Sequence, residues 1–310
     1  MSTDEPPTPR RRGLALLWLA LPIVGLAELG AHFYFSRRPP SVEDWLDLRP
    51  AVAALRTGGE VIVTAPAWAE PLARHAFGDE LMPLDQIARS DDARVERAIE
   101  VSLIGQRAPE LSGWREASSQ KQGRFVLRVL ENPSPERVLF DFVSSLAPTH
   151  ADVLSGTELC KYTDRARVTT GGLGGPPAAP AVRFACASTF AGATVIDGEE
   201  YRARRCIWAS PAGSDPLVLR YRDVPLGNKV VGFTGVPWVL GRDGIGAHFT
   251  VEVSVAGQSI GRAEHPEGTP WSRFEYPTGV APGARGDVQF SITAEPPKAQ
   301  VFCFAASVRE

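Results

Sequence analysis

The sequence predicts an α+β protein of several domains, with one transmembrane helix, a small three-layer α/β domain and a C-terminal antiparallel β-sandwich. Three patterns support this fold class. An apolar run covers residues 13–35, helical and strand-like segments alternate between 41 and 150, and short strand-like runs recur from 181 to 310. The 310 residues, 44% of them hydrophobic, suffice for about two globular domains after the helix.

The N-terminal segment is predicted to anchor the chain in a membrane. Residues 1–12 would form a cytoplasmic tail that ends in three arginines, and the apolar helix over 13–35 would follow. At about 1.5 Å per residue, this helix is long enough for a hydrocarbon core of about 30 Å. Three arginines before it and two after it favour a cytoplasmic N-terminus and a periplasmic or extracellular remainder. A cleaved signal peptide is the alternative, because small residues at 25–27 could form a cleavage site.

Two ionisable residues lie within the expected membrane helix. Glu28 and His32 are four positions apart and therefore share one helix face. Ionisable residues at membrane depth indicate contact with a partner helix, unless they lie close enough to the interface to reach the headgroups. Both interpretations of this pair stay open.

Charge and motif content narrow the possible partners. Thirty-six acidic and 33 basic residues give a net charge of −3 without a basic stripe, so nucleic acid is not an expected partner. No Cys-x-x-Cys pattern occurs, and we expect neither a metal site nor a cofactor.

The four cysteines predict two disulfides. All four lie beyond the apolar segment, as is typical of exported proteins whose cysteines pair. Of the three possible pairings we favour Cys206 with Cys303 and Cys160 with Cys186, because Cys206 and Cys303 lie in the first and last strong strands of the terminal domain. Buried free thiols are the alternative.

Residues 41–150 are predicted to form the α/β domain. Helices are expected at 42–57, 69–78 and 109–117, and strands at 60–68, 98–105 and 123–131. The turn after the first strand lacks the glycines of a Rossmann fingerprint or a phosphate loop. Trp68, Glu70, Arg74 and His75 follow that strand and could form a polar site, or they could simply lie on an exposed helix face with an ordinary ion pair.

Residues 151–180 are predicted to be a linker, because glycine and proline crowd its second half. Its GGLGG motif lacks the Gly-Lys-Ser/Thr of a phosphate loop.

Residues 181–310 are predicted to be the sandwich. In HFTVEVSVA, apolar Phe249, Val251, Val253 and Val255 alternate with polar residues, as expected for a strand with one wet face.

Three segments of this last region are similar to a known family of β-sandwiches. They are DVPLGNKVVGFTGVPWVL, VEVSVAGQSIGRAEHPEGTPWSRFEY and DVQFSITAEPPKAQVFCFAAS. Over about the last 100 residues they resemble the galactose-binding-like jelly rolls of the carbohydrate-binding type. The resemblance implies a ligand on loops at one end or on a concave face, with aromatic rings against sugars and charged groups on hydroxyls. The residues that could serve are Trp238, Arg242, Asp243, His248, Glu264, His265, Trp271 and Arg273.

These candidates have structural alternatives. Trp271 could be a core residue, because aromatic side chains dominate sandwich cores, and Asp243 precedes a glycine as in a turn. In addition, residues 41–70 resemble soluble segments found beside membrane-bound sugar transferases, which implies an accessory module.

Three functions are consistent with these patterns. The favoured hypothesis is a membrane-tethered extracytoplasmic binding or accessory protein for an envelope glycan or a glycan-processing partner. An enzyme that acts on envelope sugars from an interdomain cleft is the second, although no Gly-x-Ser-x-Gly elbow or other catalytic motif is found and no catalytic residue is assigned. The third is a structural partner of a membrane complex.

Overall fold

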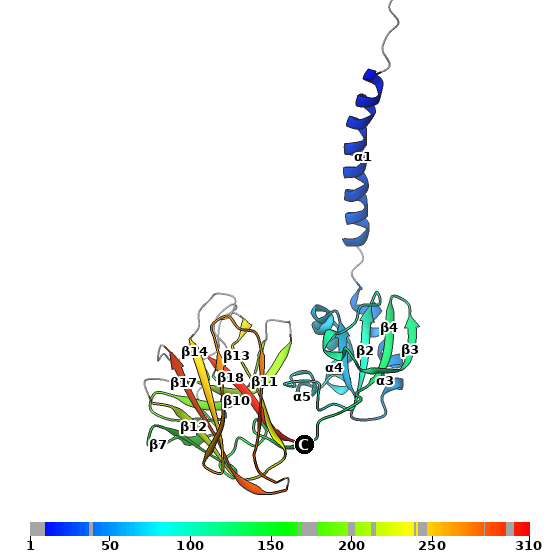
Figure 1. The fold of residues 1–310 in the computed structure, drawn as a ribbon. Coiled ribbons are helices and arrows are strands. Elements are labelled where there is room, and N and C mark those ends of the chain that lie inside the picture. Colours follow the sequence, from blue (N-terminus) through cyan, green and yellow to red (C-terminus); the bar gives the residue numbers. More distant parts are fainter. Residues whose placement is uncertain are drawn as a thin grey trace, which may run out of the picture.

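The computed structural model describes residues 10–36, 40–166, 168, 179–197, 202–211, 215–238, 240, 247–281, 283–295 and 301–310. Figure 1 shows three parts within these ranges: a long helix, a small domain that contains most of the other helices, and a sandwich of strands.

The long helix is α1 (Arg10–Ser36), with Pro22 inside it. Among the described residues, no helix is long and apolar enough to cross a membrane. The predicted transmembrane helix over 13–35 is therefore wrong. The described part of α1 includes the ionisable Glu28 and His32. Both side chains are exposed on α1, and their contact with a partner stays a prediction.

The small domain contains one mixed sheet of four strands in the order β1-β2-β4-β3. The strands are β1 (Val61–Ala65), β2 (Arg97–Leu103), β3 (Arg115–Gln122) and β4 (Phe125–Glu131). Only β1 and β2 run parallel within it. The helical elements are α2 (Val42–Leu46), α3 (Arg49–Leu55), η1 (Ala67–Ala69), α4 (Glu70–Leu81), α5 (Leu84–Ile87) and η2 (Pro109–Leu111).

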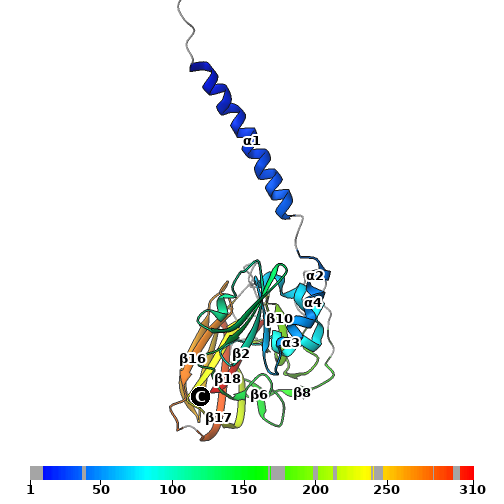
Figure 2. The same cartoon turned by 90° about the vertical axis from the view of Figure 1, so that its right-hand side faces the viewer.

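Helices α2, α3 and α4 gather on one side of this sheet (Figure 2). Trp45 of α2 is fully buried there, with its ring centroid 6.0 Å from that of Phe77 and 4.7 Å from that of Phe125. The opposite face is covered by η2 and Trp114, which pack with a second, smaller apolar cluster. The domain therefore has two main layers, and the predicted three-layer arrangement is wrong.

The error concerns residues 109–117, for which the sequence predicts a helix. In the structure η2 ends at Leu111, and Gly113 has a φ of 85°. That left-handed backbone suits glycine and is incompatible with a continuing α-helix. The chain then enters β3, which pairs with β4. Because no membrane-spanning helix is found among the described residues either, the fold class changes to a mostly β protein with few helices.

The sandwich consists of two antiparallel sheets around one core. One sheet has the order β16-β13-β18-β11-β10-β9-β8, with β5 also paired to β18, and the other has the order β15-β14-β17-β12-β6-β7. The strands are β5 (Val138–Asp141), β6 (Ala151–Ser155), β7 (Glu158–Leu159), β8 (Lys161–Thr163), β9 (Arg183–Ala185), β10 (Phe190–Asp197), β11 (Ala203–Ala209), β12 (Leu217–Pro225), β13 (Lys229–Gly235), β14 (His248–Val255), β15 (Gln258–His265), β16 (Ser272–Pro277), β17 (Arg285–Glu295) and β18 (Phe302–Arg309).

The expected β-sandwich is confirmed by these sheets. In β14, Phe249, Val251, Val253 and Val255 are all buried, as the alternation predicts. Phe249 stacks on Phe302 of the facing sheet, with ring centroids 4.4 Å apart. Strands of the sandwich begin at Val138, and β6, β7 and β8 fall within the range 151–180 that was expected as a linker. The GGLGG motif lies outside the described residues.

Both predicted disulfides are confirmed. Cys206 of β11 is bonded to Cys303 of β18, with Cα atoms 5.6 Å apart; the two strands are neighbours, and Cys303 lies opposite Trp208, two positions from Cys206. Cys160 is bonded to Cys186, with Cα atoms 4.4 Å apart. The first bond therefore lies within one sheet of the sandwich, and the second joins segments next to β7 and β9.

Candidate functional site in the interdomain cleft

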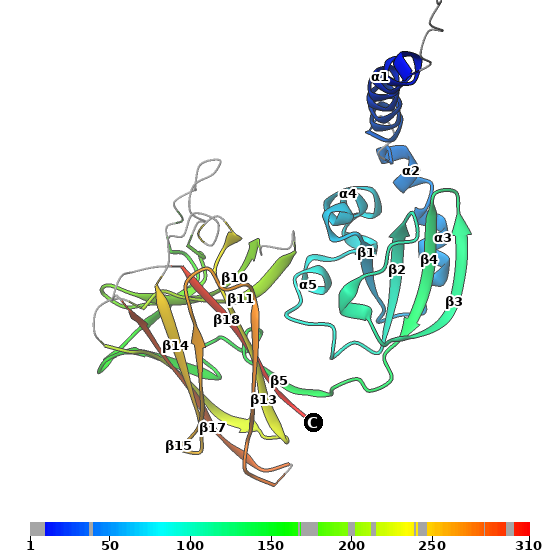
Figure 3. The ribbon, with the colours of Figure 1, turned by 45° about the horizontal axis from the view of Figure 1, so that its top comes forward.

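The small domain and the sandwich lie side by side, with α5 directed towards the sandwich (Figure 3). Between them is a cleft of about 880 Å³. Ligand sites of 300–1,000 Å³ are common at domain interfaces. The lining residues include Trp68, Ser90, Asp91, Asp92, Glu110, Trp114 and Glu136 on one side, and Arg202, Arg204, Phe233, Trp271 and Arg273 on the other.

Three tryptophans reach this cleft from three different segments. Trp68 lies in η1, directly after β1, and remains 48% exposed. Trp114 precedes β3 and is half-buried against the second apolar cluster of the small domain. Trp271 precedes β16 of the sandwich. Large aromatic rings that stay accessible in a concave site offer an apolar face to a ligand.

The Trp271 ring is fixed on several sides. Its Nε1 donates a hydrogen bond to the carbonyl oxygen of Ser90, at 3.1 Å. It stacks on Phe233 with an interplanar angle of 2° and centroids 6.0 Å apart, and the Arg204 guanidinium lies 5.8 Å from its centroid. Gly235 is required beneath it, because a Cβ there would collide with the indole. Trp271 is thus presented in one orientation.

Residues 88–92 of the small domain, which we call the docking segment, are held by the sandwich at every position. The carbonyl oxygen of Ala88 accepts from the backbone N–H of Arg205 at 2.6 Å, and those of Arg89 and Ser90 accept from Arg204 Nη1 at 3.1 Å. Asp91 is paired with Arg309, and Asp92 with Arg202. One wall of the cleft is therefore preformed by contacts between the domains.

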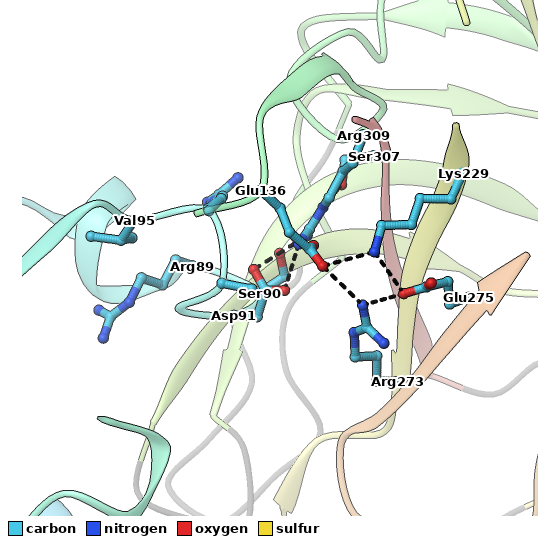
Figure 4. A network of polar contacts seen from close by, with 12 residues as sticks. Arg89, Ser90, Asp91, Val95, Glu136, Lys229, Arg273, Glu275, Ser307 and Arg309 are labelled. Carbon is cyan, nitrogen blue, oxygen red and sulfur yellow. Dashed lines mark hydrogen bonds and ion pairs between the residues drawn. The ribbon is translucent and has the colours of Figure 1, made fainter. Parts of the chain in front are cut away.

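A network of ion pairs extends from the docking segment into the sandwich, and Figure 4 shows Glu136 at its centre. Arg309 is fully buried, and its Nη1 lies 2.8 Å from Asp91 Oδ2 and 2.6 Å from Glu136 Oε2. Lys229 bridges Glu136 at 2.8 Å and Glu275 at 3.1 Å. Arg273, also in this network, lies 3.6 Å from Glu136 and 2.5 Å from Glu275.

The network sets the charge of Glu136. Burial alone would raise the pKa of the Glu136 carboxyl, but the hydrogen bonds and positive charges of Lys229 and Arg309 together outweigh burial and hold that pKa below its ordinary value. Glu136 is consequently ionised at neutral pH, with its negative charge balanced by cations on neighbouring strands.

A second group of ion pairs surrounds Arg202. This side chain is 9% exposed and contacts Glu110 closely, with Asp92 at 3.9 Å. Asp92 in turn is 2.5 Å from Arg89. Burial, together with the neighbouring arginines, lowers the pKa of the Arg202 guanidinium, although Asp92 and Glu70 act in the opposite direction. Burial also raises the pKa of the Glu70 carboxyl, although the positive charges of Arg202 and Arg89 act to lower it.

The structure brings together two of the residues expected from the sequence. Trp271 and Arg273 both line the cleft. His248 and Glu264 lie elsewhere, on β14 and β15, with His248 Nε2 3.7 Å from Glu264 Oε2. His265 is buried in β15, only 1% exposed, and its Nδ1 lies 3.2 Å from Thr234 Oγ1. Arg242 and Asp243 lie outside the described residues.

The four polar-site candidates that follow β1 line two separate depressions of the surface. Trp68 lines the cleft, whereas Glu70, Arg74 and His75 line a separate depression of about 470 Å³. Arg74 pairs with Asp79 at 3.4 Å, instead of the expected Glu70. The described ranges contain no group of three or more His, Cys, Asp or Glu residues that could hold a metal ion.

Sequence reasoning missed Trp114, Glu110, Arg202, Arg204 and the docking segment. Their spacing carries no motif, because Glu110 and Arg202 are 92 positions apart and belong to different domains. Trp114 gave the best available signal, since a tryptophan after a Ser-Gly turn is a plausible accessible aromatic.

Comparison with known proteins found no matching family model and no curated protein. Among solved structures, similar chains include carbohydrate-binding modules. CBM51 from Clostridium perfringens GH95 in complex with methyl-galactose has a TM-score of 0.28 and 12% identity, covering 38% of this chain and 81% of that one. CBM51-2 in complex with GlcNAc, with the INT domains of Clostridium perfringens ZmpB, has a TM-score of 0.32 and 10% identity, covering 66% and 46%.

A third structure, the CBM22-1 xylan-binding domain from Paenibacillus barcinonensis Xyn10C, has a TM-score of 0.27 and 11% identity, covering 48% of this chain and 93% of that one. These neighbours are of the carbohydrate-binding class that the sequence resemblance named. At such TM-scores, neither the ligands nor the binding residues of these modules are transferred to this chain.

Proposed function

We propose that this protein binds a glycan in the cleft between its small domain and its sandwich. The observation that carries the proposal is the convergence of Trp68, Trp114 and Trp271 on one cleft of about 880 Å³, next to paired arginine and carboxylate side chains. Indole faces bury the apolar C–H surface of a sugar ring, and charged groups form strong hydrogen bonds with its hydroxyls.

The rigidity of the cleft supports binding. Because the docking segment and Trp271 are already held by hydrogen bonds, little side-chain entropy is lost when a ligand enters. The state of Glu136 favours binding over acid catalysis by this residue, since a general acid at neutral pH needs a raised pKa and the pKa of Glu136 is lowered.

The proposal extends to location and partner. Two disulfides suit a compartment that does not reduce thiols, so we place the binding function outside the cytosol, with an envelope glycan as the ligand. Purification of the protein from its native cells, followed by non-reducing peptide mapping, tests this: both disulfides are expected, and free thiols at all four cysteines would contradict the location.

Binding itself is tested with the full chain on an array of envelope oligosaccharides, followed by calorimetry on the best ligand. Trp68→Ala is expected to weaken binding at least about tenfold, or about 1.4 kcal/mol, because it removes an accessible indole from the cleft. Trp238→Ala is the matched control, since Trp238 is 39% exposed but does not line the cleft. The proposal fails if no glycan binds, or if both variants weaken binding equally. Analysis of the bound glycan for released sugar distinguishes binding from hydrolysis.

A further inference from the structure

The charges in the cleft specify the ligand more closely, and this inference rests on the proposed function. We infer that the cleft selects neutral glycans and discriminates against glycans that carry carboxylate groups. The inference comes from how the charged side chains of the two walls are already paired with one another.

Every carboxylate in the described lining of the cleft has a cationic partner. Asp91 and Glu136 each contact Arg309 within 2.8 Å, and Asp92 contacts Arg89 at 2.5 Å. Glu110 is in close contact with Arg202. These carboxylates therefore do not need a cation from the ligand.

The cations of the lining are engaged as well. Arg202 lies between Glu110 and Asp92, and Arg273 lies between Glu136 and Glu275. Arg204 donates to two carbonyl oxygens of the docking segment, with its guanidinium near the Trp271 ring.

An anionic sugar would consequently have to displace a carboxylate from its arginine. The displaced carboxylate would remain in a partly buried wall without its cation, which is a costly state for an ion. The sugar would also add a negative charge beside the four carboxylates that line the cleft, at positions 91, 92, 110 and 136.

A neutral sugar meets no such penalty. A carboxylate that is paired with one arginine keeps further acceptor sites, and a guanidinium has five N–H donors. A hydroxyl group donates and accepts at once, so it can bridge a paired carboxylate and guanidinium without changing the charge of either. Binding of this kind should depend little on ionic strength.

The test compares matched oligosaccharides that differ only in the group at C6. Glucose, galactose and mannose oligomers and the corresponding uronic acid oligomers are titrated into the full chain at neutral pH, at low and high salt. We expect the preferred neutral oligomer to bind at least about tenfold more tightly than its uronic acid counterpart, with a smaller difference at high salt.

A variant that removes one of these carboxylate charges should gain affinity for the anionic oligomer. Glu110→Gln keeps the shape of the side chain but removes the charge that faces Arg202, so the uronic acid oligomer should gain about tenfold in affinity. Glu116→Gln is the control, because Glu116 pairs with Arg107 at 3.2 Å and does not line the cleft. Thermal melting checks that both variants are folded.

The outcomes separate the inference from the proposed function. A uronic acid oligomer that binds wild type as tightly as its neutral counterpart overturns the selectivity and leaves glycan binding intact. An unchanged preference in Glu110→Gln also overturns it, because the pairing would then not determine selectivity. Absence of binding by all six oligomers overturns the inference, and absence of binding on the whole array of envelope oligosaccharides as well overturns the proposed function.

Discussion

Trp271 of the sandwich donates a hydrogen bond from its indole Nε1 to the carbonyl oxygen of Ser90 in the small domain, at 3.1 Å. The same carbonyl oxygen accepts from Arg204 Nη1, also at 3.1 Å. This shared acceptor connects the aromatic wall of the cleft to the docking segment. The orientation of Trp271 therefore depends on both domains.

Replacement of Trp271 by phenylalanine tests this connection. Trp271→Phe keeps an aromatic ring but removes the N–H donor, so we expect the free energy of unfolding to fall by about 1 kcal/mol, the net value of one hydrogen bond. Glycan affinity should fall a few-fold, because the ring is no longer held in one orientation. Urea denaturation and calorimetry measure the two effects, with Trp238→Phe as the control. Equal losses in the two variants would contradict the role given to the Ser90 contact.

The sequence predicted the features that depend on local pattern. In β14 the alternation of Phe249, Val251 and Val253 identified the buried face, because strand side chains repeat every two residues. The pairing of Cys206 with Cys303 was predicted from their places in the first and last strong strands of the terminal domain. Residues 109–117 were misassigned because their spacing of apolar residues is compatible with a helix, whereas the extended backbone at Ser112 and the positive φ of Gly113 exclude one.

The cleft could be predicted only in part. Trp271 and Arg273 were expected to bind a ligand, but as members of a site within the sandwich. The opposite wall, including Glu110 and Asp92, comes from another domain, and the packing of two domains leaves no periodic signal in either. The polarity of His265 was also misleading, because its burial depends on the facing sheet, where Thr234 supplies a hydrogen-bonding hydroxyl.

A second prediction concerns the ion pairs between the domains. Arg309→Met should lower the free energy of unfolding by about 3 to 5 kcal/mol, because it leaves Asp91 and Glu136 partly buried without their shared cation. Arg137→Met is a matched control near the same end of the chain, since Arg137 pairs with Glu310 but is 76% exposed, and it should change stability by about 0 to 1 kcal/mol. Chemical denaturation of both variants measures the difference. Similar values for the two would show that the buried network contributes no more than a surface pair.

A third prediction ranks the two disulfides. The Cys206–Cys303 bond closes 97 positions of chain and the Cys160–Cys186 bond closes 26. In the chain-entropy model these loops stabilise the fold by about 4.7 and about 3.5 kcal/mol, because a longer loop restricts the unfolded chain more. Paired alanine substitutions at each bond, compared by denaturant midpoint, measure this order. The reverse order would mean that native contacts, and not loop length, determine the contribution of each bond.

The last prediction concerns the pH dependence of stability and follows from His265. Burial, with a smaller effect of the nearby His248, lowers the pKa of His265 from 6.5 to about 4. Its Nε2 has no hydrogen-bond partner among the described residues, so the folded protein keeps the ring neutral. In the unfolded chain the ring has its ordinary pKa, and between pH 6.5 and 4 the unfolded state therefore binds more protons than the folded state.

The free energy of unfolding should consequently fall as the pH drops through this range, by up to about 3 kcal/mol at pH 4. His265→Gln removes the titrating ring, so the variant should lose this part of the slope while keeping that of the carboxylates. His75→Gln, at an exposed position on α4, should retain the wild-type slope. Urea denaturation at pH 7, 6 and 5 suffices, because carboxylates contribute less in that range. If His265→Gln follows the wild-type slope, then His265 is protonated in the folded protein and its burial does not suppress the charged form.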